Sequence, residues 1–283
     1  MGSSLVPQRD ADGWQDAVTS TTHALAALCG APVGAFQPLL DRVIAVGPTP
    51  DGSLGMEWVA PTGAQRFGLT VFEHGGRDDH LGVARRLCVA HFDGEAVDAW
   101  DRLMSELQVT RVGCHVGLAW DATHGFRLKL FAAGARDMAA VARAFGTPYE
   151  KHLIGVGCDF WCGGRYRERS YFQARSVDVL RGLAPAWDAG FAPSIVVAAR
   201  QHVILTRTHE TDALGPKATW SLIFPPEATL GSVEAPFQGL VHAELPRLSV
   251  GAAPFVLRPP ALQIDRYRDG REEHELLITL APG

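Results

Sequence analysis

The sequence feature that most constrains the fold is a pair of strand-like segments joined by a turn, which occurs five times in 283 residues. In each pair, two apolar-rich runs flank turn-forming residues such as Cys162-Gly163-Gly164 or Asp269-Gly270. The pairs span residues 54–74, 112–133, 153–173, 194–224 and 262–280. Because a hairpin makes its strands antiparallel and closure removes exposed edges, these ten strands predict a closed antiparallel barrel.

Helical periodicity occupies the segments between these hairpins. Helices are predicted at residues 12–30, 33–46, 77–108 with a break near Asp93-Gly94, 135–145 and 176–187, and one more within 229–248. We therefore predict one α+β domain over residues 1–283, with N-terminal helices in residues 1–48 and five hairpin–helix repeats in residues 50–283. Its closed ten-stranded antiparallel β-barrel would enclose a solvent-filled lumen and be surrounded by α-helices.

Apolar and polar side chains alternate along most of the predicted strands, as expected where successive residues face opposite sides of a sheet. One strand alternates Phe126, Leu128 and Leu130 with Arg127, Lys129 and Phe131. Since the helices can cover the apolar face, the basic and hydroxyl-bearing face is predicted to point into the barrel. A barrel of about ten strands is wide enough to hold a ligand in its lumen.

The strand in residues 164–172 is the most basic of these segments. Read as a strand, it places Arg165, Arg167, Arg169 and Tyr171 on one face. One interpretation is an edge strand with a solvated basic face. The other is a face that points into a cavity and binds a polyanion such as a diphosphate, because guanidinium groups match phosphate oxygens.

Charge and composition exclude several classes of protein. The net charge of −5 argues against general nucleic-acid binding. The apolar runs are too short and interrupted to span a membrane, and the first ten residues lack a secretory pattern. The five cysteines are scattered and predict reduced thiols in a cytoplasmic protein. Cys158 and Cys162 are the closest pair, but two further zinc ligands at a suitable spacing are missing.

Four short motifs resemble those of the aromatic prenyltransferase barrels, known as the ABBA or PT-barrel family. They are Arg167-Glu168-Arg169-Ser170-Tyr171, similar to an Arg-x-Lys-x-Tyr strand; Lys129-Leu130-Phe131, similar to Lys-x-Tyr; Gln65-Arg66-Phe67; and Gly55-Met56-Glu57-Trp58. The resemblance runs from about residue 50 to the C-terminus. In length and motifs it is closest to the cyanobactin-type peptide prenyltransferases.

The resemblance implies a prenyltransferase that moves a short allylic group, dimethylallyl or geranyl, from its diphosphate to a peptide side chain within the lumen. Two alternatives stay open: prenylation of a small aromatic or indole metabolite, and a catalytically inactive barrel that binds a ligand. Magnesium is expected only as a companion of the diphosphate, since the sequence offers no dedicated ligand set.

The resemblance also assigns site residues. The diphosphate is expected to bind Arg66, Lys129, Arg167 and Arg169, and catalysis is assigned to Glu57 and Tyr171. Glu57 would deprotonate the acceptor, and Tyr171 would stabilise the allylic cation. Further lumen or acceptor residues are expected at Arg127, Phe131, His115, Lys217, Thr219, Ser221 and Thr279.

Several of these residues have a plainer interpretation. Glu57 could instead form a salt bridge with Arg66 across the first hairpin, and Arg127 and Lys217 could be solvated charges at the barrel rim. His115 and Asp159 are interpreted as buried, satisfied polar residues, and Trp58 and Trp220 as core residues that point outward.

Overall fold

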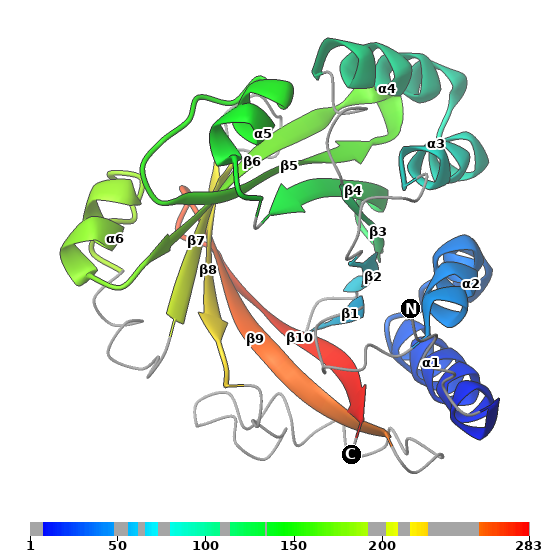
Figure 1. Cartoon of the computed structure of the whole chain (residues 1–283). Helices are drawn as coiled ribbons and strands as arrows, with labels where there is room; N and C mark the ends of the chain where they lie inside the picture. Colours follow the sequence, from blue (N-terminus) through cyan, green and yellow to red (C-terminus); the bar gives the residue numbers. More distant parts are fainter. Residues whose placement is uncertain are drawn as a thin grey trace.

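The computed structural model describes residues 8–47, 56–61, 66–72, 80–107, 114–133, 135–191, 202–208, 216–225 and 255–282. Ten strands form a closed barrel in which each strand pairs antiparallel with its neighbours in sequence, and β1 pairs with β10 (Figure 1). The strands are β1 (Met56–Pro61), β2 (Arg66–Val71), β3 (His115–Asp121), β4 (Gly125–Ala133), β5 (Leu153–Trp161), β6 (Tyr166–Ala174), β7 (His202–Thr208), β8 (Lys217–Ile223), β9 (Phe255–Tyr267) and β10 (Glu272–Pro282). The predicted fold is confirmed.

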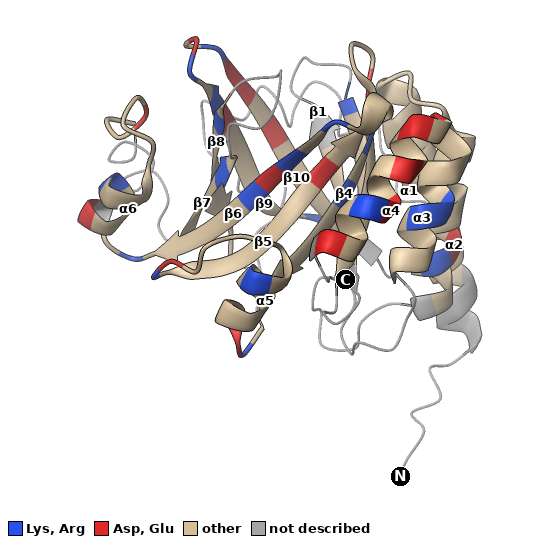
Figure 2. Cartoon of the chain, turned by 90° about the horizontal axis from the view of Figure 1, so that it is seen from above, with Lys and Arg blue, Asp and Glu red and all other residues tan. Residues whose placement is uncertain are grey.

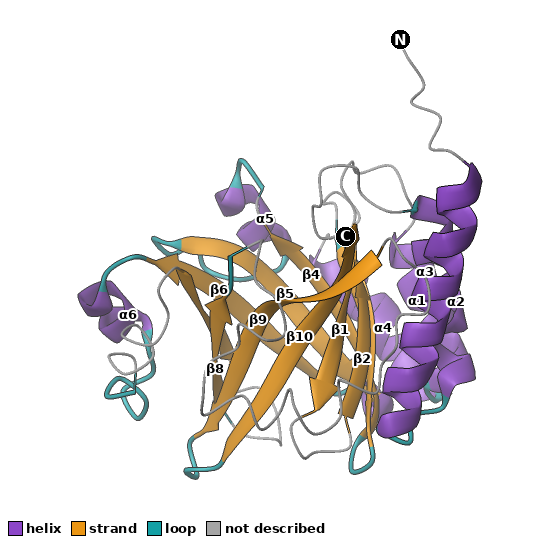
Figure 3. Cartoon of the chain, turned by 90° about the horizontal axis from the view of Figure 1, so that it is seen from below, coloured by secondary structure: helices purple, strands orange, loops and turns teal. Residues whose placement is uncertain are grey.

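The helices lie outside this barrel (Figure 3). They are α1 (Gln8–Leu28), α2 (Gln37–Val46), α3 (His80–His91), α4 (Gly94–Leu107), α5 (Met138–Ala144) and α6 (Val177–Leu183), with 3-10 turns η1 (Val33–Phe36) and η3 (Cys162–Gly164). Helices α1 and α2 pack over β2, and α3 packs over β3 and β4. Helix α5 packs over β5, and α6 packs over β6. No described helix is long and apolar enough to cross a membrane.

The apolar faces of the strands point outward against these helices, as the alternation predicted. Phe67, Leu128 and Leu130 are buried in one large apolar cluster that also contains residues of α1 to α5. Trp58 is fully buried, and its Nε1 donates a hydrogen bond to Thr22 Oγ1 of α1 at 2.9 Å. The main core of the protein therefore lies between the barrel and its helices, and the inner face carries charged, hydroxyl and aromatic side chains with a small apolar cluster of Val59, Ala261 and Leu277.

Trp220 confirms the same arrangement on the far side of the barrel. It is also fully buried, and its Nε1 donates to Asp188 Oδ2 at 2.5 Å. The other oxygen of Asp188 accepts from Arg266 Nε at 2.6 Å, so a segment outside the barrel is fixed to β8 and β9. Both tryptophans are core residues and not part of the lumen.

Two predicted helices differ from the structure. The helix expected at residues 176–187 ends at Leu183, because the residue before Pro185 is disfavoured in helical backbone and Ala184 is extended. The helix expected at residues 33–46 begins as the 3-10 turn η1 before α2 starts at Gln37. The break predicted near Asp93-Gly94 is confirmed, since it separates α3 from α4.

The fifth hairpin is longer than predicted. Strand β9 begins at Phe255, seven residues before the expected start at Leu262, and runs through Pro259-Pro260. Prolines disfavour a regular strand because they remove a donor, and here the pairing of β9 with β10 shifts register between Leu277 and Thr279. The turns of the first and fourth hairpins, and the helix expected within residues 229–248, lie outside the described residues.

Candidate active site

The inner face of the barrel brings charged residues from the predicted site into one row. Viewed from above, the strands carry Lys and Arg as well as Asp and Glu (Figure 2). Direct cross-strand pairing from β1 to β6 connects Glu57, Thr70, Gly117, Lys129, Asp159 and Arg167. Gly117 packs closely against its neighbour, because a Cβ there would lie 2.5 Å from Thr70 Oγ1, so a larger residue would force a shift. Only small side chains therefore stand between Glu57 and Lys129 along this row.

Four cations on β4 and β6 surround Asp159, and we call this group the cation wall. It consists of Arg127, Lys129, Arg167 and Arg169. Asp159 is paired across the sheet with Lys129 on one side and Arg167 on the other. Its Oδ2 accepts a short hydrogen bond from Arg169 and lies 3.5 Å from Arg127 Nη1. One buried carboxylate is thus shared by the whole cation wall.

Burial and charge on the cation wall act against each other. Asp159 is 1% exposed and Arg167 is 2% exposed. Burial alone would raise the pKa of Asp159, but Arg169 and the other three cations hold that pKa below its ordinary value. The indole of Trp161 faces two of the guanidinium groups, with Arg127 Cζ at 5.9 Å and Arg167 Cζ at 5.4 Å from the ring centroid. Such contacts stabilise buried cations.

The opposite side of the lumen carries three carboxylates, Asp265, Glu273 and Glu275, which we call the carboxylate wall. Arg66 from β2 contacts all three: it forms a short ion pair with Glu275, lies 3.0 Å from Glu273 and lies 3.8 Å from Asp265. Lys217 from β8 forms a short ion pair with Asp265. The cations on this side are therefore held by carboxylates of the last hairpin.

These pairs correct two of the plainer interpretations. The ion pairs of Arg66 are with β9 and β10, and not with Glu57, whose direct partner across the first hairpin is Thr70. Lys217 and Arg127 are not solvated rim charges, because they are 4% and 8% exposed. The structure places both inside the lumen.

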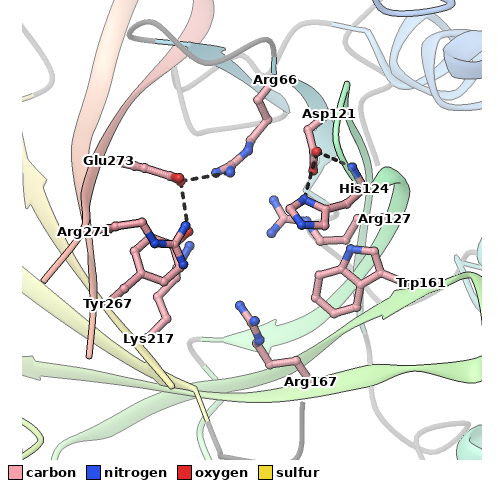
Figure 4. A pocket seen from close by; sticks show the side chains of 10 residues that line it. All are labelled: Arg66, Asp121, His124, Arg127, Trp161, Arg167, Lys217, Tyr267, Arg271 and Glu273. Atoms are coloured by element: carbon pink, nitrogen blue, oxygen red, sulfur yellow. Dashed lines mark hydrogen bonds and ion pairs between the residues drawn. The ribbon is translucent and has the colours of Figure 1, made fainter. Parts of the chain in front are cut away.

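A pocket of about 80 Å³ opens at the end of the barrel where the hairpins turn (Figure 4). Its lining consists of Arg66, Asp121, His124, Arg127, Trp161, Arg167, Lys217, Tyr267, Arg271 and Glu273. Arg66 and Arg167, both predicted to bind the diphosphate, line it together. Lys129 lies two residues farther from its hairpin turn than Arg127, and Arg169 lies two residues farther than Arg167. Both are therefore beyond the pocket, next to Asp159.

Aromatic rings line the lumen beyond these cations. The ring centroids of His115 and Phe131 are 4.9 Å apart, and those of Phe131 and Tyr171 are 6.0 Å apart. Phe72, which follows β2, lies 5.3 Å from His115 and 5.6 Å from Phe131. Burial raises the pKa of Tyr171, so its phenol stays neutral. The predicted residues His115, Phe131 and Tyr171 thus form one continuous aromatic surface.

Glu57 and Lys129 have pKa values close to neutrality. Burial raises the pKa of Glu57 to about 7, an effect that Lys129 opposes and Glu275 reinforces. Burial, together with Arg127, lowers the pKa of Lys129 to about 8. A carboxyl group with a pKa near 7 can both accept and release a proton at neutral pH, which suits a general base.

The predicted hydroxyl residues of the lumen are bound to other parts of the barrel. Thr219 Oγ1 donates to Asp265, and Ser221 Oγ accepts from Gln263 Nε2 at 3.3 Å. Thr279 Oγ1 donates to the backbone oxygen of Met56 at 2.7 Å, which links β10 to the start of β1. These contacts favour a supporting function for the three hydroxyls in holding strands and carboxylates in place.

Sequence reasoning assigned no site function to five residues that shape the lumen: Phe72, Trp161, Asp265, Glu273 and Glu275. The period-2 alternation places each of them on the inner face of its strand, so the signal was present. A search for diphosphate ligands selects cations and passes over acids. The pairing of Arg66 with Glu275 joins residues 209 positions apart, a contact that periodicity does not show.

The carboxylates of the lumen are occupied by protein cations. Among the residues that the structure describes, no group of three or more His, Cys, Asp or Glu side chains is arranged to hold a metal ion. Asp265 and Glu275 bind Lys217 and Arg66, and Asp159 binds Arg169.

Solved structures with a similar fold were found across nearly the whole chain. AnaPT from Neosartorya fischeri superposes with a TM-score of 0.60 at 13% identity, covering 98% of this chain and 96% of AnaPT. The prenyltransferase PriB, in complex with product diphosphate, gives 0.61 at 12% identity and covers 95% of each chain. The 5-dimethylallyltryptophan synthase from Streptomyces coelicolor gives 0.59 at 14% identity, covering 95% of this chain and 96% of the synthase.

Sequence comparison adds nothing to this structural likeness. No protein-family model matches the chain, and no curated protein matches it. Identities of 12 to 14%, with at least 95% of each chain covered, show a shared architecture and leave the chemistry to be argued from the site. The chain has the closed ten-stranded fold of the ABBA aromatic prenyltransferases.

Proposed function

We propose that the protein is a prenyltransferase that moves a short allylic group from its diphosphate to an aromatic acceptor inside the barrel. The observation that carries this proposal is the convergence of Arg127, Lys129, Arg167 and Arg169 on one buried anionic position, with aromatic rings directly beyond it. Buried cations of this number need an anion, and the neighbouring rings suit an apolar chain attached to that anion.

The first step is the departure of the diphosphate. The bond between the allylic carbon and the diphosphate oxygen breaks, and its electron pair stays on the diphosphate. The cation wall stabilises the negative charge that develops on the leaving oxygen, because its head groups are already assembled in a site that water hardly enters. Arg167 and Arg169 can each offer several N–H donors to phosphate oxygens.

The allylic cation then needs electron-rich surroundings until the acceptor attacks. Phe131 and Tyr171 present their rings beside the cation wall and would stabilise this carbocation through cation–π interactions. Because the pKa of Tyr171 is raised, its phenol stays protonated and is not expected to capture the cation as a phenolate. His115 and Phe72 extend this surface and would keep water away from the cation.

The acceptor must finally lose a proton, and Glu57 is the proposed base. An aromatic carbon that attacks the cation forms a positively charged ring, and loss of its proton restores aromaticity. Glu57 lies in the same row as Lys129 and has a pKa of about 7, so a useful fraction of it is ionised at neutral pH. A protonated Glu57 would in turn return its proton to solvent after the product leaves.

The acceptor is proposed to be aromatic. The sequence resemblance favoured a peptide side chain and the cyanobactin-type enzymes, and the structural comparisons give no support for that subgroup. The name of one similar protein, 5-dimethylallyltryptophan synthase, refers to a prenylated aromatic amino acid. A small aromatic or indole acceptor is therefore the form of the proposal that we carry forward.

Mass spectrometry of acceptor mixtures tests this function. The protein is incubated with dimethylallyl or geranyl diphosphate and with tryptophan, indole compounds and peptides containing Trp, Tyr, His or Arg. We expect an aromatic acceptor to gain the mass of one prenyl group while pyrophosphate is released, and we expect Arg167→Ala to weaken both signals. If the donor binds but no acceptor is modified, the alternative of a non-catalytic binding barrel replaces the proposal.

A further inference from the structure

The cation wall already contains an anion of the protein itself. Asp159 lies between Lys129 and Arg167 in the cross-strand row, and its carboxylate contacts Arg169 and Arg127. The four cations that surround this carboxylate are those of the proposed diphosphate site. A diphosphate that binds the same cations would therefore have to displace this buried carboxylate or share its partners.

A single carboxylate does not satisfy the wall completely. The contacts of Asp159 with Arg127 and Arg169 both involve the same oxygen, Oδ2. The Nε of Arg169 is buried and finds no hydrogen-bond partner among the residues that the structure describes. Buried donors are nearly always paired in native proteins. The wall therefore has donor capacity for an anion with more oxygens than a carboxylate.

We infer that Asp159 is a placeholder for the diphosphate, a positioning residue that keeps the cation wall assembled in the absence of the donor and competes with the donor for the same cations. This inference rests on the proposed function, because it takes the cation wall as the diphosphate site. A placeholder explains why four cations can be buried side by side before the donor arrives. Because Asp159 competes for these cations, the placeholder also predicts weaker binding of the donor and faster release of pyrophosphate than the cations alone would give.

A purely structural ion pair makes a different prediction. If Asp159 only stabilised the barrel, its removal would lower the stability and leave the affinity for pyrophosphate unchanged or weaker. If Asp159 competes, its removal lowers the stability and strengthens pyrophosphate binding, because a negative charge a few ångströms from the ligand disappears. The two accounts agree on stability and have opposite signs for affinity.

The test is a calorimetric titration of inorganic pyrophosphate into four proteins: wild type, Asp159→Asn, Asp159→Glu and Asp188→Asn. Asp188 is a matched control: it is also 1% exposed and binds an arginine, Arg266, but outside the barrel. We expect Asp159→Asn to bind pyrophosphate at least about tenfold more tightly than wild type. Asp159→Glu keeps the charge and should stay near wild type, and Asp188→Asn should lower the melting temperature without changing the affinity.

A melting experiment covers the case in which Asp159→Asn folds poorly. Because pyrophosphate would replace the missing carboxylate, added pyrophosphate should restore folding of this variant and raise its melting temperature more than that of wild type. Failure of pyrophosphate to restore folding, or unchanged or weaker binding by a folded variant while wild type binds, would overturn the placeholder inference alone. If neither wild type nor Asp159→Asn binds pyrophosphate, the proposed diphosphate site is overturned as well.

Discussion

The two walls of the lumen are built from the same hairpin repeat and carry opposite charge. The cation wall on β4 and β6 has four cations around the carboxylate of Asp159. The carboxylate wall on β9 and β10 has three acids, across which Arg66 and Lys217 lie. The period of a strand decides only which residues face inward, so one repeat can present either charge to the lumen.

The comparison separates the predicted diphosphate residues into two kinds. Lys129, Arg167 and Arg169 belong to the cation wall, where the anion is a single aspartate. Arg66 has three carboxylate neighbours, and binding a diphosphate would require it to leave at least one of them. We therefore expect the cation wall to supply most of the donor affinity and Arg66 to supply much of the stability that ties β2 to the last hairpin.

Glu57 lies between the two walls, and its replacement should give the largest effect. We expect Glu57→Gln to lower the single-turnover rate at saturating acceptor by about two to four orders of magnitude, the scale of general-base loss, with pyrophosphate affinity unchanged. Rapid-quench kinetics and a pyrophosphate titration measure the two quantities. A weaker affinity for pyrophosphate with an unchanged single-turnover rate would instead show that Glu57 helps to bind the donor, as the cation wall does.

Arg167 tests the cation wall directly. Its side chain is buried in the lumen, and we expect Arg167→Ala to weaken pyrophosphate binding by about 3 kcal/mol, the usual cost of losing a buried charge-assisted contact. Calorimetry measures the loss, and Arg181→Ala on the exposed surface of α6 is the control. If Arg66→Ala loses as much affinity as Arg167→Ala, then both walls bind the diphosphate and the distinction between them is wrong.

Glu275 tests the carboxylate wall. Burial would raise its pKa, but Arg66, Lys217 and Lys129 hold that pKa well below its ordinary value. Glu275→Gln should lower the free energy of unfolding at pH 7 by about 2 kcal/mol, less than the 3–5 kcal/mol for a charge left alone, because Arg66 keeps Glu273 and Asp265. Urea denaturation checks this value.

The pH dependence of the Glu275 effect gives a second check. Because the pKa of Glu275 is lower in the folded protein than in the unfolded one, its charge stabilises the fold above the unfolded-state pKa of about 4.3. That contribution is lost as the pH falls from about 4.3 toward the pKa of the folded protein. The difference between wild type and Glu275→Gln should therefore shrink progressively below about pH 4. A difference that persists unchanged in acid would show that packing, and not the charge of Glu275, accounts for the loss.

The smallest effect concerns the contribution of Glu57 to the stability of the protein. Because its pKa is raised to about 7 by burial, the folded state keeps a proton that the unfolded state has already released between about pH 4.5 and 7. Stability is lost as the pH rises through this window. Glu57→Gln should match wild type at about pH 4 and exceed it by about 1–2 kcal/mol as the pH approaches about 6. Destabilisation at pH 8 would indicate that Glu57 is held by a salt bridge.

The sequence by itself determined the barrel and its polarity. Turn residues such as Gly163-Gly164 separate apolar-rich runs, and the alternation of Leu128 and Leu130 with Lys129 assigns an outer and an inner face. Both signals are local, since they depend on neighbours within a few residues. They were enough to place Glu57, Arg167 and Tyr171 inside the lumen before any contact was known.

Only the tertiary structure decided which charges meet. Closure of the barrel pairs β1 with β10 and brings Arg66 to Glu275, 209 residues away, although Glu57 lies on the neighbouring strand of the same hairpin. The register of β4, β5 and β6 places Asp159 at the centre of four cations. Strand alternation says which face a side chain occupies, but its partner depends on how far each strand is staggered against the next, and that stagger is set by the closed barrel as a whole.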